Sequence, residues 1–332
     1  MNARESTVGP SDILVTGATG FVGTAVLREL VGRGMGERVR VLTRRPVPWW
    51  MTEAGVTTWF GDLTDAPSLA GLCTGITTLV HLASQVGGDP ALCTAVNEDG
   101  TANILAEARD SGTTGVLYLS TCAVYRDGVH RGVAEPACGS GLMTDPVSPT
   151  SRSRLAGERL VLAAGGTVLR PHLIHGTGDR HLVPALIRWI QAVPAWAAGG
   201  SACASLVAVA DLAAAVAVLA LNPPASRQDG DIFHVADPRP VRVRQLVTTM
   251  CELLDLPLPV VDLPLDEHRV RTRAELPALS DHQYSLLTRD HWYESSRIWE
   301  LTGVSPGPGF GPRLAEAADW YRESLGIREP VG

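Results

Sequence analysis

The order of apolar and polar residues divides the chain into a regular first part and an irregular second part. From residue 12 onward, short apolar runs alternate with longer stretches in which apolar residues recur with a helical period. The predicted strands are residues 13–15, 39–42, 57–60, 78–82, 116–119 and 167–169. The predicted helices include residues 21–30, 92–110 and 151–164. Continuous apolar strands separated by helices are typical of a parallel sheet covered on both faces, so we expect a doubly wound α/β fold.

This alternation ends near residue 176. Residues 179–204 and 238–315 are rich in Pro, Trp and irregular apolar runs, whereas residues 208–221 and 232–235 predict a helix and a strand that return to the first part. The predicted parts are a flexible tail (1–10), a first domain (11–178, joined by 205–236) and a smaller, discontinuous C-terminal lobe (179–204 and 237–330). We expect this lobe to face the carboxyl ends of the strands, where open α/β sheets bind ligands.

Composition and charge narrow the class of protein. Hydrophobic residues make up 45% of the chain and charged residues 19%, as in ordinary globular enzymes. A net charge of −7 gives no reason to expect nucleic acid or an anionic membrane as a partner. The first residues do not resemble a secretory signal, and the most apolar segment, 206–221, is too short to span a bilayer and contains Asp211. We therefore expect a cytoplasmic protein with neither nucleic acid nor a membrane as a partner.

The cysteines and the basic residues add two constraints. The 6 cysteines form no CxxC pair and no cluster with metal-ligand spacing, so we expect buried free thiols and no metal site. The chain contains no lysine, and all 28 basic residues are arginines. No mechanism of this protein can therefore use a lysine amine.

A glycine motif follows the first predicted strand and opens the first predicted helix. It reads Thr16-Gly17-Ala18-Thr19-Gly20-Phe21-Val22-Gly23. Gly17 allows a tight turn, Gly20 lets the backbone approach a pyrophosphate, and Gly23 allows the helix to pack on the sheet. The phosphates would lie at the helix N-terminus, where free N–H groups favour negative charge. The motif predicts a Rossmann-type dinucleotide site.

The end of the second strand bears on which dinucleotide binds. A site for NAD usually has Asp or Glu at this position to bind the ribose 2′-hydroxyl, whereas a 2′-phosphate favours arginine. Here Arg44 and Arg45 follow the strand, and no acid occurs before Glu53. The pair could be an ordinary solvated surface pair, but two guanidinium groups suit a phosphate. The sequence therefore favours NADP(H).

Further motifs occur in order along the chain. They are Gly61-Asp62-Leu63, His81-Leu82-Ala83-Ser84, Asn97-Glu98-Asp99-Gly100-Thr101-Ala102-Asn103, Ser120-Thr121-Cys122-Ala123-Val124-Tyr125, Arg170-Pro171, Gly176-Thr177-Gly178-Asp179, Val209-Ala210-Asp211 and Trp320-Tyr321. With the glycine motif, they make almost the whole chain resemble an extended short-chain dehydrogenase/reductase of the NAD(P)-dependent epimerase/dehydratase type. The resemblance implies that NADP(H) contacts Gly17, Thr19, Gly20, Phe21, Val22, Gly23, Arg44, Arg45, Asp62, Leu63, Leu82, Ala83, Ser84, Arg154, Pro171 and His172.

The chain departs from this family at the catalytic dyad. Members normally carry a Tyr and a Lys four residues apart, the first to exchange a proton with the substrate oxygen and the second to lower its pKa and bind ribose. Here the matching positions are Thr150 and Arg154. A threonine hydroxyl is too weak an acid for this task near pH 7, and an arginine can bind ribose but cannot exchange a proton. The usual dyad is absent.

Other candidates for contacts with a substrate remain near the expected site. Thr121 lies at the family position that hydrogen-bonds a substrate carbonyl, although it could also be an ordinary strand-end hydroxyl. The family's sugar dehydratases have an acidic pair at the next two positions, where this chain has Cys122 and Ala123, so we do not expect a dehydratase. Residues that could contact a substrate, with packing as the alternative for each, are Gln85, Tyr125, His175, Trp189 and Trp292. Tyr125, His172 and His175 could also replace the missing proton donor.

Three functions are compatible with these residues. The first is an NADPH-dependent ketoreductase with an unusual proton source, and the second a non-catalytic NADP(H)-binding regulator or scaffold. The third, a sugar epimerase, is disfavoured by the missing tyrosine and by the arginine pair. The lost dyad and arginine-only composition resemble atypical ketoreductases that tailor aromatic polyketide antibiotics. We therefore expect an aromatic ketone as substrate, assisting its own reduction, and a monomer or a homodimer.

Overall fold

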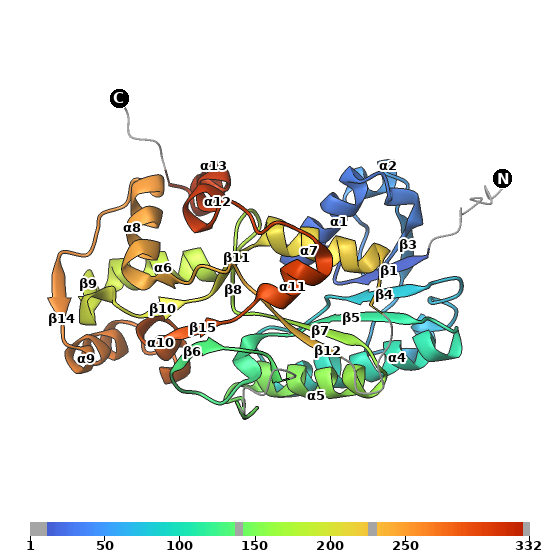
Figure 1. The fold of residues 1–332 in the computed structure, drawn as a ribbon, viewed down its shortest axis with the longest axis horizontal. Helices are drawn as coiled ribbons and strands as arrows, with labels where there is room; N and C mark the ends of the chain where they lie inside the picture. Colours follow the sequence, from blue (N-terminus) through green and yellow to red (C-terminus); the bar gives the residue numbers. More distant parts are fainter. Residues whose placement is uncertain (1–11, 137–141, 225–230, 328–332) are drawn as a thin grey trace. The chain divides into compact units, whose positions relative to one another are not determined.

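The computed structural model describes residues 12–136, 142–224 and 231–327 (Figure 1). The tail expected at residues 1–10 and the thiol of Cys138 lie outside these residues. The described chain forms two compact units. The first comprises the described residues of Met1–Val124, Ser148–Leu169 and Ala213–Phe233, and the second those of Tyr125–Val147, Arg170–Leu212 and His234–Gly332.

The first unit contains a seven-stranded sheet with the order β12-β7-β5-β4-β1-β2-β3. Its strands are β1 (Ile13–Thr16), β2 (Val39–Thr43), β3 (Thr57–Phe60), β4 (Thr78–His81), β5 (Gly115–Leu119), β7 (Thr167–Pro171) and β12 (Asp231–Val235), the last two of which end in the second unit. The pairings from β7 to β3 are all parallel. The predicted doubly wound, Rossmann-type α/β fold is therefore confirmed.

Helices cover both faces of this sheet, with α1 along one face and α4 and α5 along the other in Figure 1. The longer helices are α1 (Phe21–Gly32), α4 (Gly100–Asp110), α5 (Pro149–Ala163) and α7 (Val209–Leu221), which begins in the second unit. Short helical segments are η1 (Gly36–Arg38), α2 (Trp49–Glu53), η2 (Ala66–Leu69), α3 (Pro90–Thr94) and η4 (Cys122–Val124). Leu14, Leu79 and Ile104 belong to the buried core between the sheet and α4.

Two predicted helices differ in detail. The helix expected at residues 92–110 is α3, a π-helical turn, η3 (Ala95–Asp99), and then α4. The π turn contains buried Asn97, and such turns are frequent where a side chain must serve a functional site. The helix expected to begin at residue 151 begins at Pro149, because the Ser148 hydroxyl accepts a hydrogen bond from the Ser151 amide and caps it.

The second unit combines short strands with seven helices among the described residues. A four-stranded sheet has the order β13-β10-β15-β6, and β11-β8 and β14-β9 form two pairs. The strands are β6 (His130–Val133), β8 (Leu173–His175), β9 (Ala195–Ala197), β10 (Cys203–Ala204), β11 (Leu206–Ala208), β13 (Val241–Arg242), β14 (Val261–Leu263) and β15 (His291–Tyr293). The helices are α6 (Leu182–Ala192), α8 (Val243–Leu254), α9 (Leu265–Glu275), α10 (Asp281–Thr288), α11 (Ser296–Thr302), α12 (Phe310–Glu316) and α13 (Ala318–Leu325), and η6 (Ala198–Gly200) is a short turn.

The boundaries of this unit differ from those of the predicted lobe. Residues 125–136, 142–147 and 170–178, expected in the first domain, belong to the second unit, as do residues 205–212. One reason is that β6 pairs with β15, a partner about 160 residues away along the chain. Local periodicity carries no information about such a distant pairing.

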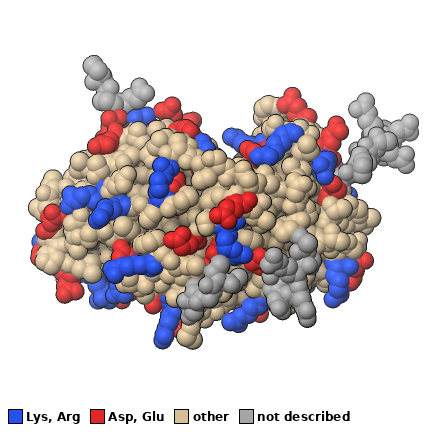
Figure 2. All heavy atoms as spheres, in the orientation of Figure 1, with Lys and Arg blue, Asp and Glu red and all other residues tan. Residues whose placement is uncertain are grey.

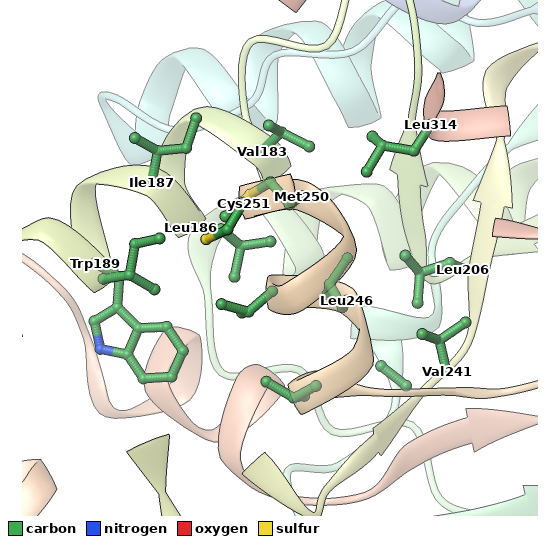
Figure 3. Close-up of a cluster of buried hydrophobic side chains, with 14 of the residues drawn as sticks. Val183, Leu186, Ile187, Trp189, Leu206, Val241, Leu246, Met250, Cys251 and Leu314 are labelled. Atoms are coloured by element: carbon green, nitrogen blue, oxygen red, sulfur yellow. The ribbon is translucent and has the colours of Figure 1, made fainter. Parts of the chain in front are cut away.

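The core of the second unit forms around α6 and α8 (Figure 3). On α8 the buried residues recur at helical spacing, from Val243 through Leu246 and Met250 to Leu254. They pack against Leu186 and other buried residues of the same cluster. This apolar contact stabilises a unit whose sheets are too small to form a core alone.

Charged side chains of both signs are interspersed on the face drawn in Figure 2. No helix among the described residues is both long enough and apolar enough to cross a membrane. Nor do the described residues contain a group of three or more His, Cys, Asp or Glu side chains that could hold a metal ion.

Candidate functional site

The glycine turn after β1 is shaped by close backbone contacts. Gly17 has φ +69°, and a Cβ atom on it would lie 2.6 Å from the Ala83 nitrogen after β4. A Cβ atom on Gly23 would lie 2.1 Å from the Gly17 oxygen. No side chain caps α1 at Gly20, and its first turn contains no acid. The turn therefore exposes uncapped N–H groups to an anion, and Gly17 and Gly23 cannot be replaced without moving backbone.

The arginine pair lies at the end of β2. The Arg44 side chain is 70% exposed, and its Nη1 atom lies 3.5 Å from Oδ2 of Asp62. Burial alone would raise the pKa of Asp62, but hydrogen bonds from Thr64 and the charge of Arg44 outweigh it and lower that pKa. Arg45 is also exposed. The Thr43 hydroxyl donates a hydrogen bond to the Arg45 carbonyl and accepts one from the Arg45 amide. Arg44 is thus available to a ligand at the cost of one weak, solvated ion pair.

The loop after β4 is held by the π turn. The Gln85 amide donates to Oδ1 of Asn97 at 2.7 Å, and Asn97 Nδ2 donates back to the Gln85 oxygen at 3.0 Å. The same Nδ2 also donates to the Ser153 hydroxyl at 2.9 Å. Ser84, one residue earlier, has a buried hydroxyl without a hydrogen-bond partner in the described parts of the chain. Such an orphaned buried hydroxyl is a candidate ligand contact.

Arg154 lies beneath the end of β5. Its Nη2 atom donates to the carbonyl oxygens of Leu119 at 2.7 Å and Ser120 at 2.8 Å. Burial lowers the pKa of Arg154, although a guanidinium stays charged in proteins. The Nε atom of Arg154 and the hydroxyl of Ser120 are buried without partners among the residues described. The side chain expected to bind ribose therefore has part of its hydrogen-bonding capacity committed to this strand end.

Thr121 follows directly on this strand end. Its hydroxyl oxygen accepts a hydrogen bond from the Ala123 amide at 3.1 Å. An accepted bond fixes the oxygen and leaves the hydroxyl proton free to be donated. Thr121 therefore retains the donor that its family position requires.

Thr150 is engaged by backbone. Its hydroxyl accepts a hydrogen bond from the Gly87 amide at 2.9 Å and lies 3.7 Å from the Cys93 sulfur. The position that carries the catalytic tyrosine in the family is therefore in contact with the loop after β4. Thr150 thus makes a structural contact where the family has a tyrosine that exchanges a proton.

Tyr125, in the second unit, belongs to a buried network. Arg170 Nη1 donates to the Tyr125 oxygen at 2.7 Å, and that oxygen lies 2.7 Å from Nε2 of His234. His234 Nδ1 lies 3.0 Å from the Glu294 carbonyl oxygen and must carry the proton, so Nε2 accepts from the Tyr125 hydroxyl. The phenol proton is thus committed to His234, which argues against Tyr125 as a proton source.

A second tyrosine–histidine pair follows the same logic. His130 Nε2 lies 3.0 Å from the Arg126 carbonyl oxygen, so its Nδ1 accepts from the Tyr293 hydroxyl at 2.7 Å. The Tyr293 ring stacks on that of Tyr125, with centroids 5.8 Å apart. No local sequence pattern predicted this network, because the pairing of β6 with β15 brings His130 and Tyr293 together from distant segments.

The remaining candidates in the second unit differ in their surroundings. His172 stacks on His291, and its buried Nε2 has no hydrogen-bond partner in the described chain. Burial and, secondly, the charge of His291 hold the pKa of His172 well below its usual value. His175 is buried against Phe310 with an orphaned Nδ1, and burial lowers its pKa to about 4. Pro171 is buried at the end of β7.

Two tryptophans were expected as possible substrate contacts. Trp189 lies in the core of the second unit, where its Nε1 donates to the Thr272 hydroxyl at 3.3 Å (Figure 3). This environment agrees with packing, the alternative considered for it. Trp292 is half-buried over Gly132, where a Cβ atom would lie 2.8 Å from its ring. Their contacts with a substrate stay predictions.

Comparison with known proteins agrees with this architecture. Residues 13–236 match the family described as the NAD dependent epimerase/dehydratase family. A 4-hydroxy-2-methyl-3-oxo-4-farnesyl-3,4-dihydroquinoline-1-oxide ketoreductase of Stigmatella aurantiaca is 28% identical over 264 residues, 77% of each chain. A 2-alkyl-3-oxoalkanoate reductase of Stenotrophomonas maltophilia is 29% identical over 259 residues, 74% of this chain and 76% of the relative.

A solved structure shares the fold across almost the whole chain. The dTDP-glucose 4,6-dehydratase DesIV of Streptomyces venezuelae, solved with NAD bound, superposes with a TM-score of 0.73. The match covers 97% of this chain and 100% of that structure at 21% sequence identity. The chain belongs to the NAD dependent epimerase/dehydratase family, and it is an enzyme of the oxidoreductase class.

Proposed function

We propose that this protein is a cytoplasmic, NADPH-dependent ketoreductase that reduces a ketone of an aromatic polyketide without a tyrosine–lysine dyad. The observation that carries the proposal is the state of the two dyad positions. The Thr150 hydroxyl is held by the Gly87 amide, and Arg154 is held by two carbonyl oxygens of β5. Neither side chain can exchange a proton, so the proton must come from another source, for which the substrate itself is our proposal.

The residues of the first unit suit a dinucleotide with a 2′-phosphate. The uncapped N-terminus of α1 offers free N–H groups to a pyrophosphate. Glycine keeps the turn before it in this conformation, because a Cβ atom at Gly17 or Gly23 would collide with backbone. Arg44 is available to a 2′-phosphate, and Ser84 offers an orphaned hydroxyl. When bound, NADPH would supply the hydride. Pro171 and His172 stay predicted contacts.

A ketone substrate is supported by the relatives. The quinoline-oxide ketoreductase and the 2-alkyl-3-oxoalkanoate reductase are both named for reducing a carbonyl group. The first of them is named for a ketone in a fused ring system, and the resemblance to atypical ketoreductases of aromatic polyketides also implies a ring ketone. The reaction requires only that a carbonyl carbon be held beside the cofactor and its oxygen beside a donor.

Thr121 is the donor proposed for the carbonyl oxygen. Hydride addition to the carbonyl carbon builds negative charge on that oxygen, and stabilising this charge is usually the largest catalytic effect. The Thr121 hydroxyl is fixed by the Ala123 amide and keeps its proton available. A hydroxyl on the substrate ring beside the ketone would transfer its proton to the new alkoxide and then regain one from water.

The experiment that tests this function uses two ring ketones, one with a free hydroxyl beside the carbonyl and one in which it is methylated. We expect NADPH to be consumed with the first, and turnover to fall by about 10²–10⁴-fold with the second, the usual contribution of a positioned acid. Competition between the two ketones shows whether the methylated one still binds. Equal turnover would overturn substrate assistance.

The second candidate is a non-catalytic NADP(H)-binding regulator, favoured by the same engaged dyad positions. It predicts tight binding of NADPH without turnover of any ketone tested. The retained donor at Thr121 argues for the enzyme, because a regulator has no use for it.

A further inference from the structure

The loop that follows β4, residues 82–89, leaves the sheet at its centre. In the strand order, β4 lies between β1 and β5. The loop therefore emerges between the glycine turn that follows β1 and Thr121, which follows β5. Because ligands bind at the carboxyl ends of the strands in such sheets, its conformation shapes the space next to the reacting carbonyl.

Two anchors hold this loop. Asn97 binds both the amide and the carbonyl of Gln85, at 2.7 Å and 3.0 Å. Two residues later the Thr150 hydroxyl accepts from the Gly87 amide at 2.9 Å. The Ser153 hydroxyl links the anchors, because it accepts from Asn97 at 2.9 Å and donates to the Thr150 carbonyl at 3.0 Å.

The conformation of residues 86–88 depends on the hydrogen bond to Thr150. Gly87 and Gly88 have φ +70° and +83°, and a Cβ atom on Gly87 would meet nothing within 4 Å. Val86 is 55% exposed, so apolar packing contributes little here. Among the described residues, the Gly87 oxygen also accepts hydrogen bonds from Gln85 Nε2 at 3.1 Å and from the Cys93 sulfur at 3.5 Å. A glycine pair with so little packing is ordered chiefly by hydrogen bonds.

We propose that Thr150 is a positioning residue, which holds the loop at residues 85–88 as one wall of the substrate site and so contributes to selection of the ketone. This inference rests on the proposed function only for the identity of the substrate.

The test compares Thr150→Val, which keeps the shape but loses the acceptor, with Thr150→Ser, which keeps the acceptor. Hydrogen exchange reports on the peptide containing Gly87 and Gly88. Alkylation of Cys93, read by peptide mapping, reports on the same segment because this buried thiol contacts the Gly87 oxygen. We expect Thr150→Val to raise both rates roughly three- to tenfold, the effect of one lost hydrogen bond, and Thr150→Ser to leave them near wild type.

The matched control is Thr94→Val. Its hydroxyl is exposed and donates to the Pro90 oxygen within α3, so its loss should leave Gly87 exchange unchanged. If Thr150→Val left the exchange and alkylation rates unchanged, Thr150 would not anchor the loop, whichever substrate the enzyme reduces.

Kinetics with the hydroxylated ring ketone test the role in the site. We expect Thr150→Val to raise KM for the ketone roughly three- to tenfold, with kcat and its pH profile unchanged, because the anchor shapes the site and transfers no proton. A fall in kcat with an altered pH profile would instead make Thr150 part of the proton path and overturn the proposal. If the wild-type enzyme reduces no ketone, the proposed function fails while the exchange experiment still decides the anchor.

Discussion

The two units use polar side chains in different ways. In the first unit, the side chains of Asn97, Thr150 and Arg154 bind backbone groups and fix loops at the ends of strands. In the second, one buried network joins polar side chains to one another, as Tyr125 does with Arg170 and His234. The first group of contacts sets the shape of a site, whereas this network lies in the buried interior of the second unit.

Histidines are also distributed unequally between the two units. Of the 9 histidines, only His81 belongs to the first unit, where the hydroxyls of Thr16 and Thr101 flank it at 2.6 Å and 3.0 Å. The other eight belong to the second unit. Burial, the largest cause, lowers the pKa of His175, His234 and His291 to about 4. Burial also lowers the pKa of His81 to about 4. Acid should therefore destabilise both units, and the second unit more, because it contains more such histidines.

The largest expected effect is the loss of stability of the second unit in acid. A histidine with a pKa near 6.5 when unfolded and about 4 when folded binds protons more tightly in the unfolded chain. Its contribution is complete above about pH 6.5 and falls as the pH drops towards 4, by about 3 kcal/mol for each such residue. Urea unfolding at pH 7 and pH 4.5, with hydrogen exchange resolved by peptide, measures it.

His175→Leu isolates one of these residues. The Nδ1 atom of His175 has no hydrogen-bond partner in the described chain, and its ring packs on Phe310, so an apolar side chain should fit. We expect the variant to lose about 2–3 kcal/mol less than wild type between pH 7 and pH 4.5. His181→Leu is the control, because His181 is exposed. The same acid sensitivity in both variants would contradict the assignment.

The next effect lies in the first unit and concerns affinity. Arg44→Ala removes a guanidinium whose present partner, Asp62, is 3.5 Å away. If this group binds a 2′-phosphate, its loss should weaken NADPH binding by about 1.5–3 kcal/mol, roughly 10- to 100-fold, and barely affect NADH. Titration of both cofactors measures this difference. Arg33→Ala removes the same charge from the end of α1, where Arg33 pairs with Glu29, and should change neither affinity.

The sequence predicted the first unit better than the second for a physical reason. Strand and helix periodicity are local, and they placed β1 to β5 and the turn from Gly17 to Gly23 correctly. The pairing of His130 on β6 with His291 on β15 joins distant segments, so no local pattern near either residue predicted it. The β6 segment, expected in the first domain, accordingly belongs to the second unit.

The candidate site shows the same limit at the level of single residues. The absence of the dyad at Thr150 and Arg154 followed from the sequence, because residue type alone decides whether a proton can be exchanged. Their present partners did not follow, because the Gly87 amide and the carbonyl oxygens of β5 belong to backbone that any sequence provides. Buried Asn97 within a predicted helix was the signal that a loop is anchored there.

The smallest expected effect is on the free energy of unfolding when one buried tyrosine of each unit is replaced by phenylalanine. Tyr125→Phe in the second unit removes an oxygen that accepts from Arg170 and donates to His234, each at 2.7 Å. Tyr118→Phe in the first removes a hydroxyl that donates to the Arg154 carbonyl at 3.3 Å. Both rings are 2% exposed, so the two changes differ mainly in the bonds they remove.

We expect Tyr125→Phe to lower the free energy of unfolding by about 1–2 kcal/mol, because two buried polar groups lose a short hydrogen bond. Tyr118→Phe should cost less, about 0.5 kcal/mol, since the bond to the Arg154 carbonyl is long. Urea unfolding at pH 7 measures both. Turnover of the ring ketone by folded Tyr125→Phe should match wild type, because the phenol proton is held by His234 and takes no part in reduction. A loss of turnover without a loss of stability would instead identify Tyr125 as the missing proton donor and reverse the contrast between the units.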